Sequence, residues 1–131
     1  MKTQVQFRSS QFPSYDGEQD EINPGLWGKR LVEYLVPRLL EKGIETEPMV
    51  AEDWGWYLPV RNERFRLALC CGHQSGAEED EFVIFTDPFT PIVRKFFFRK
   101  IDATPQLKRL CDALREILAT DPEIRDIVWF Q

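Results

Sequence analysis

The chain has 131 residues, of which 43% are hydrophobic and 30% charged, and this length and composition are typical of one globular domain. Its formal net charge of -5 disfavours nonspecific binding to nucleic acid, which depends on Lys and Arg side chains that neutralise phosphates, and favours a basic partner. No apolar run has the length of a signal peptide or a membrane span, and three cysteines do not make a disulfide framework, so we expect a cytoplasmic protein with reduced thiols.

The first third of the sequence predicts a strand, a loop and a helix. Residues 4–8 alternate apolar and polar side chains, as a half-buried strand does. Residues 9–22 are rich in Ser, Pro, Gly and acids, and therefore predict an exposed, flexible acidic loop. Asn23 and Pro24 form a helix start, and apolar residues then recur every four positions as far as Lys42. Gly43 is expected to end that helix in the left-handed conformation.

The middle of the chain predicts an antiparallel meander. In residues 52–60, Trp54 and Trp56 are expected to share one face of a strand, and residues 64–72 form the second strand of a hairpin. Residues 82–85 predict a third, short strand. The segment 92–100 is ambiguous, because its apolar residues fit a helical face whereas three consecutive phenylalanines favour a strand; we expect a short helix.

The C-terminal third predicts a strongly amphipathic helix that begins at Thr104 and Pro105 and stops at Asp121, followed by a strand over 124–130. The whole chain, 1–131, therefore predicts a single α+β domain with two main helices on one face of a mainly antiparallel sheet. The predicted element order is β-α-β-β-β-(short α)-α-β. The opposite face of the sheet is expected to display Tyr57, Arg64 and Arg66, together with either Val128 and Phe130 or Ile127 and Trp129.

Four residues are candidates for chemistry. Glu52 and Asp53 precede an apolar strand, where partial burial could raise the pKa of a carboxyl group, although acids in this position are more often solvated. Cys70 and His73 could form a nucleophile and base pair at a strand end. A metal site is disfavoured because Cys70 and Cys71 point to opposite faces of a strand and the chain has one histidine. We expect no catalytic residue, no metal and no cofactor.

One basic segment, 94–100, interleaves phenylalanines with Arg and Lys, a pattern that could stack bases and hold phosphates. The same pattern describes an amphipathic element packed on the sheet, so nucleic-acid binding is the less favoured alternative. The residues expected to contact a partner are Glu52, Asp53, Tyr57, Arg64, Arg66, Arg94, Lys95 and Arg99.

Three motifs, Asn23–Lys29, Glu52–Trp56 and Asp126–Trp129, resemble a group of small uncharacterised bacterial proteins that span most of this length. The resemblance implies no activity.

The sequence therefore predicts a non-catalytic protein-binding domain, with an acidic immunity or antitoxin-type inhibitor as its most specific version. In that version Glu52, Asp53 and the acidic run 78–81 would steer a basic partner. Two alternatives remain open. One is a small hydrolase-like enzyme that uses carboxylate or thiol chemistry, and the other is nucleic-acid binding through residues 94–100.

Overall fold

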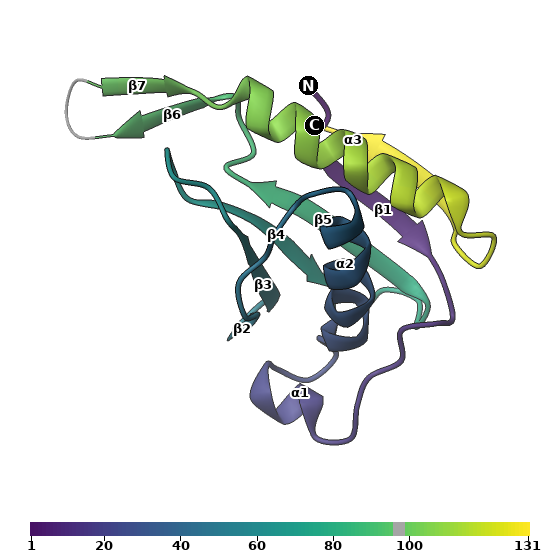
Figure 1. The fold of residues 1–131 in the computed structure, drawn as a ribbon. Coiled ribbons are helices and arrows are strands. Elements are labelled where there is room, and N and C mark those ends of the chain that lie inside the picture. The colour runs from purple at the N-terminus through teal and green to yellow at the C-terminus, as the bar shows by residue number, and fades with distance from the viewer. Residues whose placement is uncertain (96–98) are drawn as a thin grey trace.

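The computed structural model describes residues 1–95 and 99–131, which form three helices, a six-stranded sheet and a separate two-stranded hairpin (Figure 1). The elements follow in the order β1 (Gln4–Arg8), α1 (Glu18–Glu21), α2 (Lys29–Glu41), β2 (Val50–Glu52), β3 (Gly55–Val60), β4 (Leu67–Gly72), β5 (Glu81–Asp87), β6 (Ile92–Lys95), β7 (Arg99–Asp102), α3 (Thr104–Thr120) and β8 (Arg125–Phe130). The large sheet has the strand order β2-β3-β4-β5-β1-β8, and its neighbouring strands are all antiparallel. The predicted α+β class with a mainly antiparallel sheet is confirmed.

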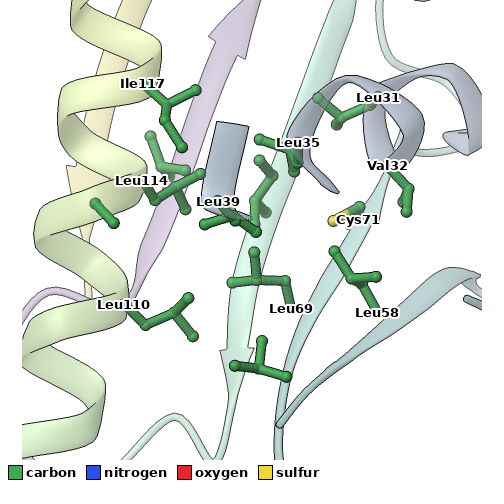
Figure 2. Close-up of a cluster of buried hydrophobic side chains, with 14 of the residues drawn as sticks. Leu31, Val32, Leu35, Leu39, Leu58, Leu69, Cys71, Leu110, Leu114 and Ile117 are labelled. Atoms are coloured by element: carbon green, nitrogen blue, oxygen red, sulfur yellow. The ribbon is translucent and has the colours of Figure 1, made fainter. Parts of the chain in front are cut away.

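Helices α2 and α3 lie against the same face of the sheet, and the core fills the space between them and the strands (Figure 1). Figure 2 shows apolar side chains of both helices meeting those of β3 and β4. Each fully buried leucine of this kind stabilises the fold by roughly 1.5–3 kcal/mol relative to an exposed one. The labelled members of this core are Leu31, Val32, Leu35, Leu39, Leu58, Leu69, Cys71, Leu110, Leu114 and Ile117.

The other face of the sheet, which we call the open face, carries a row of side chains that crosses all six strands. Directly opposed residues in an antiparallel sheet point to the same face, and the strand registers place one such row across it. The row runs from β2 to β8 through Val50, Tyr57, Cys70, Phe85, Gln4 and Phe130. Val128 lies on this face as well, opposite Gln6, whereas Ile127 and Trp129 pack against the core. The first of the two predicted alternatives for β8 is therefore confirmed.

Helix α2 begins at Lys29, so the predicted start at Asn23 and Pro24 is wrong. The cap residue is Gly28, and a carboxylate distant in sequence, that of Glu18, accepts hydrogen bonds from the backbone N–H groups of Gly28 and Lys29 at 2.7 and 2.9 Å. Asn23 instead donates from its side-chain amide to the carbonyl of Asp53 at 2.8 Å. The predicted end is confirmed, since Gly43 has a φ of 77°.

Trp54 and Trp56 do not share a face, because the predicted strand 52–60 is interrupted. Residues 53 and 54 form the turn between β2 and β3, which pair with Glu52 opposite Gly55. Trp56 is buried on the helix side, and Trp54 lies beside Tyr57 and Phe85 on the open face. Period-two alternation holds only within an unbroken strand, so a turn between the two tryptophans separates them.

The described residues of the segment 92–100 are strands, so the expected short helix is wrong for them. Residues 92–95 and 99–102 are the strands β6 and β7, paired in antiparallel register from Ile92 opposite Asp102 to Lys95 opposite Arg99. In the described residues, the β preference of the branched side chains Ile92, Val93 and Ile101 has therefore prevailed over the apolar spacing that favoured a helix. Phe96, Phe97 and Phe98, which contributed to both interpretations, lie outside the described residues.

The segment 9–22 is less exposed than its composition indicates. Phe12, Glu18 and Ile22 are buried, and residues 18–21 form the single-turn helix α1. Phe12 packs edge-on against Tyr34 and Phe82, with ring centroids 5.0 and 5.6 Å apart. Ser9 is buried too, so the prediction of an exposed segment is wrong for these four residues. Phe12 and Ile22 belong to the hydrophobic core, and the side chains of Ser9 and Glu18 accept hydrogen bonds. The flexibility of the segment stays a prediction.

Candidate functional site

Four aromatic side chains gather at one corner of the open face, where β2 to β5 meet. Trp54 lies between Tyr57 and Phe85, with ring centroids 6.4 and 5.9 Å away, and the two ring pairs are inclined at 69° and 44°. Phe89, just beyond β5, is 70% exposed and lines the same depression. Tyr57 and Phe85 reach this corner because both oppose Cys70 in the sheet register. Trp54, Tyr57 and Phe85 are half-buried, so part of each side chain remains accessible beside the exposed Phe89.

Two carboxylates line the same depression, which we call the Trp54 hollow. It has a volume of about 400 Å³, and its lining consists of Glu52, Trp54, Tyr57, Cys70, Phe85, Thr86, Asp87 and Phe89. Glu52 reaches it from the end of β2 and Asp87 from the end of β5. The Tyr57 hydroxyl donates a hydrogen bond to Asp87 Oδ2 at 2.9 Å, which fixes the position of that carboxylate. The hollow is thus an apolar, aromatic depression with negative charge at two edges.

The titratable groups of the Trp54 hollow experience this negative field. Burial raises the pKa of the Cys70 thiol to about 12, and the charges of Asp87 and Glu52 add to the effect. Burial likewise raises the pKa of the Tyr57 phenol to about 12, with further contributions from the hydrogen bond to Asp87 and its charge. The thiol is therefore held protonated at neutral pH and is a poor nucleophile, because the thiolate is the reactive form.

His73 does not form a pair with Cys70. Its ring stacks on Trp27 with a centroid separation of 3.7 Å and an interplanar angle of 6°, and is only 3% exposed. Its Nδ1 and Nε2 lie 2.8 and 2.9 Å from the carbonyl oxygens of Gly25 and Glu78. Cys70, by contrast, points to the open face. Both ring nitrogens are thus committed to the backbone, and His73 joins two loops to the end of β4.

The remaining predicted binding residues on the meander are dispersed. Asp53 is exposed in the β2–β3 turn but does not line the Trp54 hollow. Arg66 is exposed and close enough for its charge to oppose the rise in the pKa of Tyr57. Arg64 is exposed near Asp102, whose pKa is lowered mainly by hydrogen bonds from Thr104 and to a smaller extent by Arg64. The structure thus brings Glu52 and Tyr57 together with Arg66 nearby, and places Arg64 towards β7.

The basic residues of the segment 94–100 belong to the β6–β7 hairpin, which is a separate sheet (Figure 1). Arg94 and Arg99 are exposed on it, and Lys95 opposes Arg99 in the register. The phenylalanines between them lie outside the described residues, so nucleic-acid binding by this segment stays a prediction.

Glu18 is a residue that the sequence does not single out. Its side chain is 2% exposed, and Oε2 accepts hydrogen bonds from the N–H groups of Gly28 and Lys29 and from Trp56 Nε1, the last at 2.9 Å. Oε1 accepts a further one from the N–H of Tyr15, also at 2.9 Å. This carboxylate joins the 9–22 segment to α2 and β3, and all its partners belong to the fold, so its role is structural.

Asp87 and Phe89 were missed as well, although they complete the Trp54 hollow. The signal that could have found them is the strand register, because Asp87 and Phe85 share the face of Tyr57 once β4 is placed between their strands. That register depends on the lengths of two loops and cannot be read from one strand alone.

Comparisons with protein-family models, with curated proteins and with solved structures found no match to this chain. The resemblance to small bacterial proteins therefore stays a prediction. Among residues 1–95 and 99–131, no helix combines the length and the apolar character that crossing a bilayer requires. Within the same residues, no three His, Cys, Asp or Glu side chains cluster as metal ligands would.

Proposed function

We propose that this chain is a protein-binding domain that uses the open face of its sheet to hold a basic partner, as an acidic immunity or antitoxin-type inhibitor does. The observation that carries the proposal is the Trp54 hollow, where four aromatic side chains lie beside the carboxylates of Glu52 and Asp87. Exposed aromatic side chains are the commonest anchors of protein interfaces, and complementary charge at their edge speeds association with the right partner.

The open face offers apolar area beyond the hollow. Val50 and Val128 are 46% and 57% exposed, and both lie on this face, at its β2 and β8 edges. Charged side chains at the far end of the same face pair with one another, since Arg8 contacts Glu81 and Asp80, and Arg125 contacts Asp80. A partner could therefore bury the apolar side chains without leaving these charges unpaired. Exposed apolar side chains next to charges that are already paired suit a protein interface, where apolar area is buried and the charged rim stays solvated.

The enzyme alternative has less support at this site. Its thiol, Cys70, has a pKa of about 12 and lies on the face opposite to His73, whose two ring nitrogens lie 2.8 and 2.9 Å from backbone carbonyl oxygens. The described residues that line the hollow place aromatic rings around the two carboxylates and include no histidine or lysine that could exchange a proton with them.

The experiment is a cross-linked pull-down from the native cell with matched charge-reversal variants. The open-face variant carries Glu52→Lys and Asp87→Lys, and the control carries Asp112→Lys and Glu116→Lys on the exposed side of α3. A partner recovered by the wild type and the control, but lost with the open-face variant, supports the proposal. Equal recovery by all three proteins contradicts it, and so does a partner lost only with the control.

A further inference from the structure

We propose that the Trp54 hollow accepts the side chain of one arginine of the partner, with its guanidinium group against the aromatic rings and between the carboxylates of Glu52 and Asp87. The inference rests on the proposed function, to which it adds the chemical identity of the contact residue.

A cation fits the hollow better than a neutral or acidic group. Aromatic faces carry negative partial charge and attract cations within about 6 Å of the ring centroid, most strongly for Trp. Trp54 has two ring neighbours at 5.9 and 6.4 Å, so that a planar group entering the hollow meets more than one ring. Glu52 and Asp87 add two formal negative charges at the edge. An acidic side chain would be repelled by both, and a purely apolar one would bring no positive charge to balance them.

Arginine suits this geometry better than lysine because its guanidinium is planar, stacks on rings and donates several hydrogen bonds in one plane. The chain itself shows this preference. Arg38, Arg30 and Arg115 place the guanidinium carbon 3.7, 3.8 and 4.1 Å from the ring centroids of Tyr34, Tyr15 and Trp129. The Nζ of Lys29 remains 5.6 Å or more from the rings that it approaches. A stacked guanidinium thus packs closely on rings of the kind present in the hollow.

Asp87 is positioned to receive such a group. Its Oδ2 accepts a hydrogen bond from the Tyr57 hydroxyl, so the carboxylate is oriented before a partner arrives. An ionised carboxylate has about four acceptor positions, which leaves room for a guanidinium N–H. The nearby cation of this chain, Arg66, acts against the incoming charge, because it is close enough to lower the pKa of Tyr57 against the effect of burial. Removing it should strengthen the binding of an arginine.

The test uses blocked pentapeptides of sequence Gly-Ser-X-Ser-Gly, in which X is Arg, Lys or Glu, titrated into the whole ¹⁵N-labelled chain. We expect the Arg peptide to shift the indole signal of Trp54 and the backbone amide signals of Tyr57 and Phe85 with saturation, the Lys peptide to bind more weakly and the Glu peptide not to bind. The amide signals follow binding in every variant, including Trp54→Ala. Trp54→Ala and Asp87→Asn should each weaken the Arg peptide about tenfold, in line with the loss of a cation–π contact or of a charge-assisted hydrogen bond. Arg66→Gln should tighten it by a few-fold.

Glu116→Gln, on the helix side of the molecule, is the matched charge control and should bind the Arg peptide as the wild type does. Asp87→Asn keeps the inference testable if Trp54→Ala fails to fold. Absence of saturable binding, equal binding of the Glu or Lys peptide, or unchanged binding by Asp87→Asn would overturn the inference. The pull-down tests the proposed function separately. If charge reversal of the open face abolishes recovery of a partner but the wild-type chain does not bind the Arg peptide, the arginine contact is refuted and the proposed function is not.

Discussion

At the level of single residues, Glu18 is the clearest test of how the 9–22 segment is held to the start of α2 and to β3. Its buried carboxylate accepts four hydrogen bonds, from Tyr15, Gly28, Lys29 and Trp56. Glu18→Gln replaces one acceptor oxygen by an amide group that faces a donor, so at least one buried N–H loses its partner. We expect a loss of about 1–3 kcal/mol in the free energy of unfolding. Urea denaturation measures it, with exposed Glu21→Gln as the control; equal midpoints would show that the carboxylate is dispensable.

Gly28 shows why glycine stands at this point of the Asn23–Lys29 motif. A Cβ at this position would lie 2.9 Å from Gly72 Cα and 3.0 Å from the Cys71 carbonyl oxygen, both backbone atoms of β4. Gly28→Ala must therefore push α2 away from the sheet, which we expect to destabilise the fold by about 1–3 kcal/mol, as overpacking does. The measurement is the thermal midpoint. A variant with the wild-type midpoint would show that the start of α2 can move away from β4 without a loss of stability.

The thiol of Cys70 provides a residue-scale test of the environment of the Trp54 hollow. Its pKa is raised to about 12, chiefly by burial and then by Asp87 and Glu52, so the thiolate is scarce at pH 8. We expect it to react with a thiol reagent roughly a thousandfold more slowly in the folded protein than in urea, where the pKa is ordinary. The Cys70→Ser variant shows which part of the modification time course belongs to the Cys70 thiol. Rapid modification of Cys70 in the native state would show an open, polar hollow.

At the level of elements, α3 is the helix whose sequence and structure agree best. Its apolar residues form one stripe from Leu107 to Leu118, and all of them are buried. Leu114→Ala removes a side chain that is 1% exposed and should cost about 2–5 kcal/mol, because the core around it relaxes only in part. Leu40→Ala, at a position on α2 that is 58% exposed, should change stability by less than about 0.5 kcal/mol. Similar urea midpoints for the two variants would contradict the core in Figure 2.

The elements that the sequence predicts correctly are those whose side-chain period is visible within one segment. Amphipathic α3, the hairpin of β3 and β4, and β1 with its buried Val5 and Phe7 each show their period within one segment. The start of α2 was misplaced because its cap is the side chain of Glu18, ten positions before Gly28, and no local pattern reports such a contact. In the part of the chain that the structure describes, residues 92–95 and 99–102 pair with each other and with no other strand. A short apolar run with so little surrounding sheet could not decide between helix and strand.

The candidate site was predictable only in part for the same reason. Glu52 and Tyr57 stand out in the sequence because aromatic and acidic side chains adjoin there. Trp54 was placed on the wrong face because the turn before β3 was not apparent. Asp87 enters the Trp54 hollow through the pairing of β4 with β5, which is a property of the assembled sheet. The sequence thus identifies residues that can contribute to a binding surface, but the pairing of the strands decides which of them lie together.

At the level of the whole molecule, each of the three tyrosines donates its hydroxyl hydrogen to a carboxylate, and this pattern makes stability depend on pH. Tyr15 bonds to Glu33, Tyr34 to Asp121 and Tyr57 to Asp87. The pKa values of Tyr34 and Tyr57 are raised to about 12, in both by burial first and then by the carboxylate, and the pKa of Tyr15 is raised chiefly by its hydrogen bond to Glu33. The folded state therefore binds these protons more tightly than the unfolded chain does.

The expected result is a loss of stability on the alkaline side. A group whose pKa is raised on folding stabilises the native state fully below its unfolded pKa, near 10 for a phenol, and this contribution disappears as pH rises towards 12. The urea midpoint should therefore fall between pH 10 and pH 12, together with any effect of lysine deprotonation. Tyr34→Phe isolates the phenol, because it removes one ionising group and one hydrogen bond and leaves the ring. The variant should be less stable than the wild type at pH 8 and should lose less stability between pH 10 and pH 12; parallel pH profiles would show that Tyr34 ionises alike in the folded and unfolded chains.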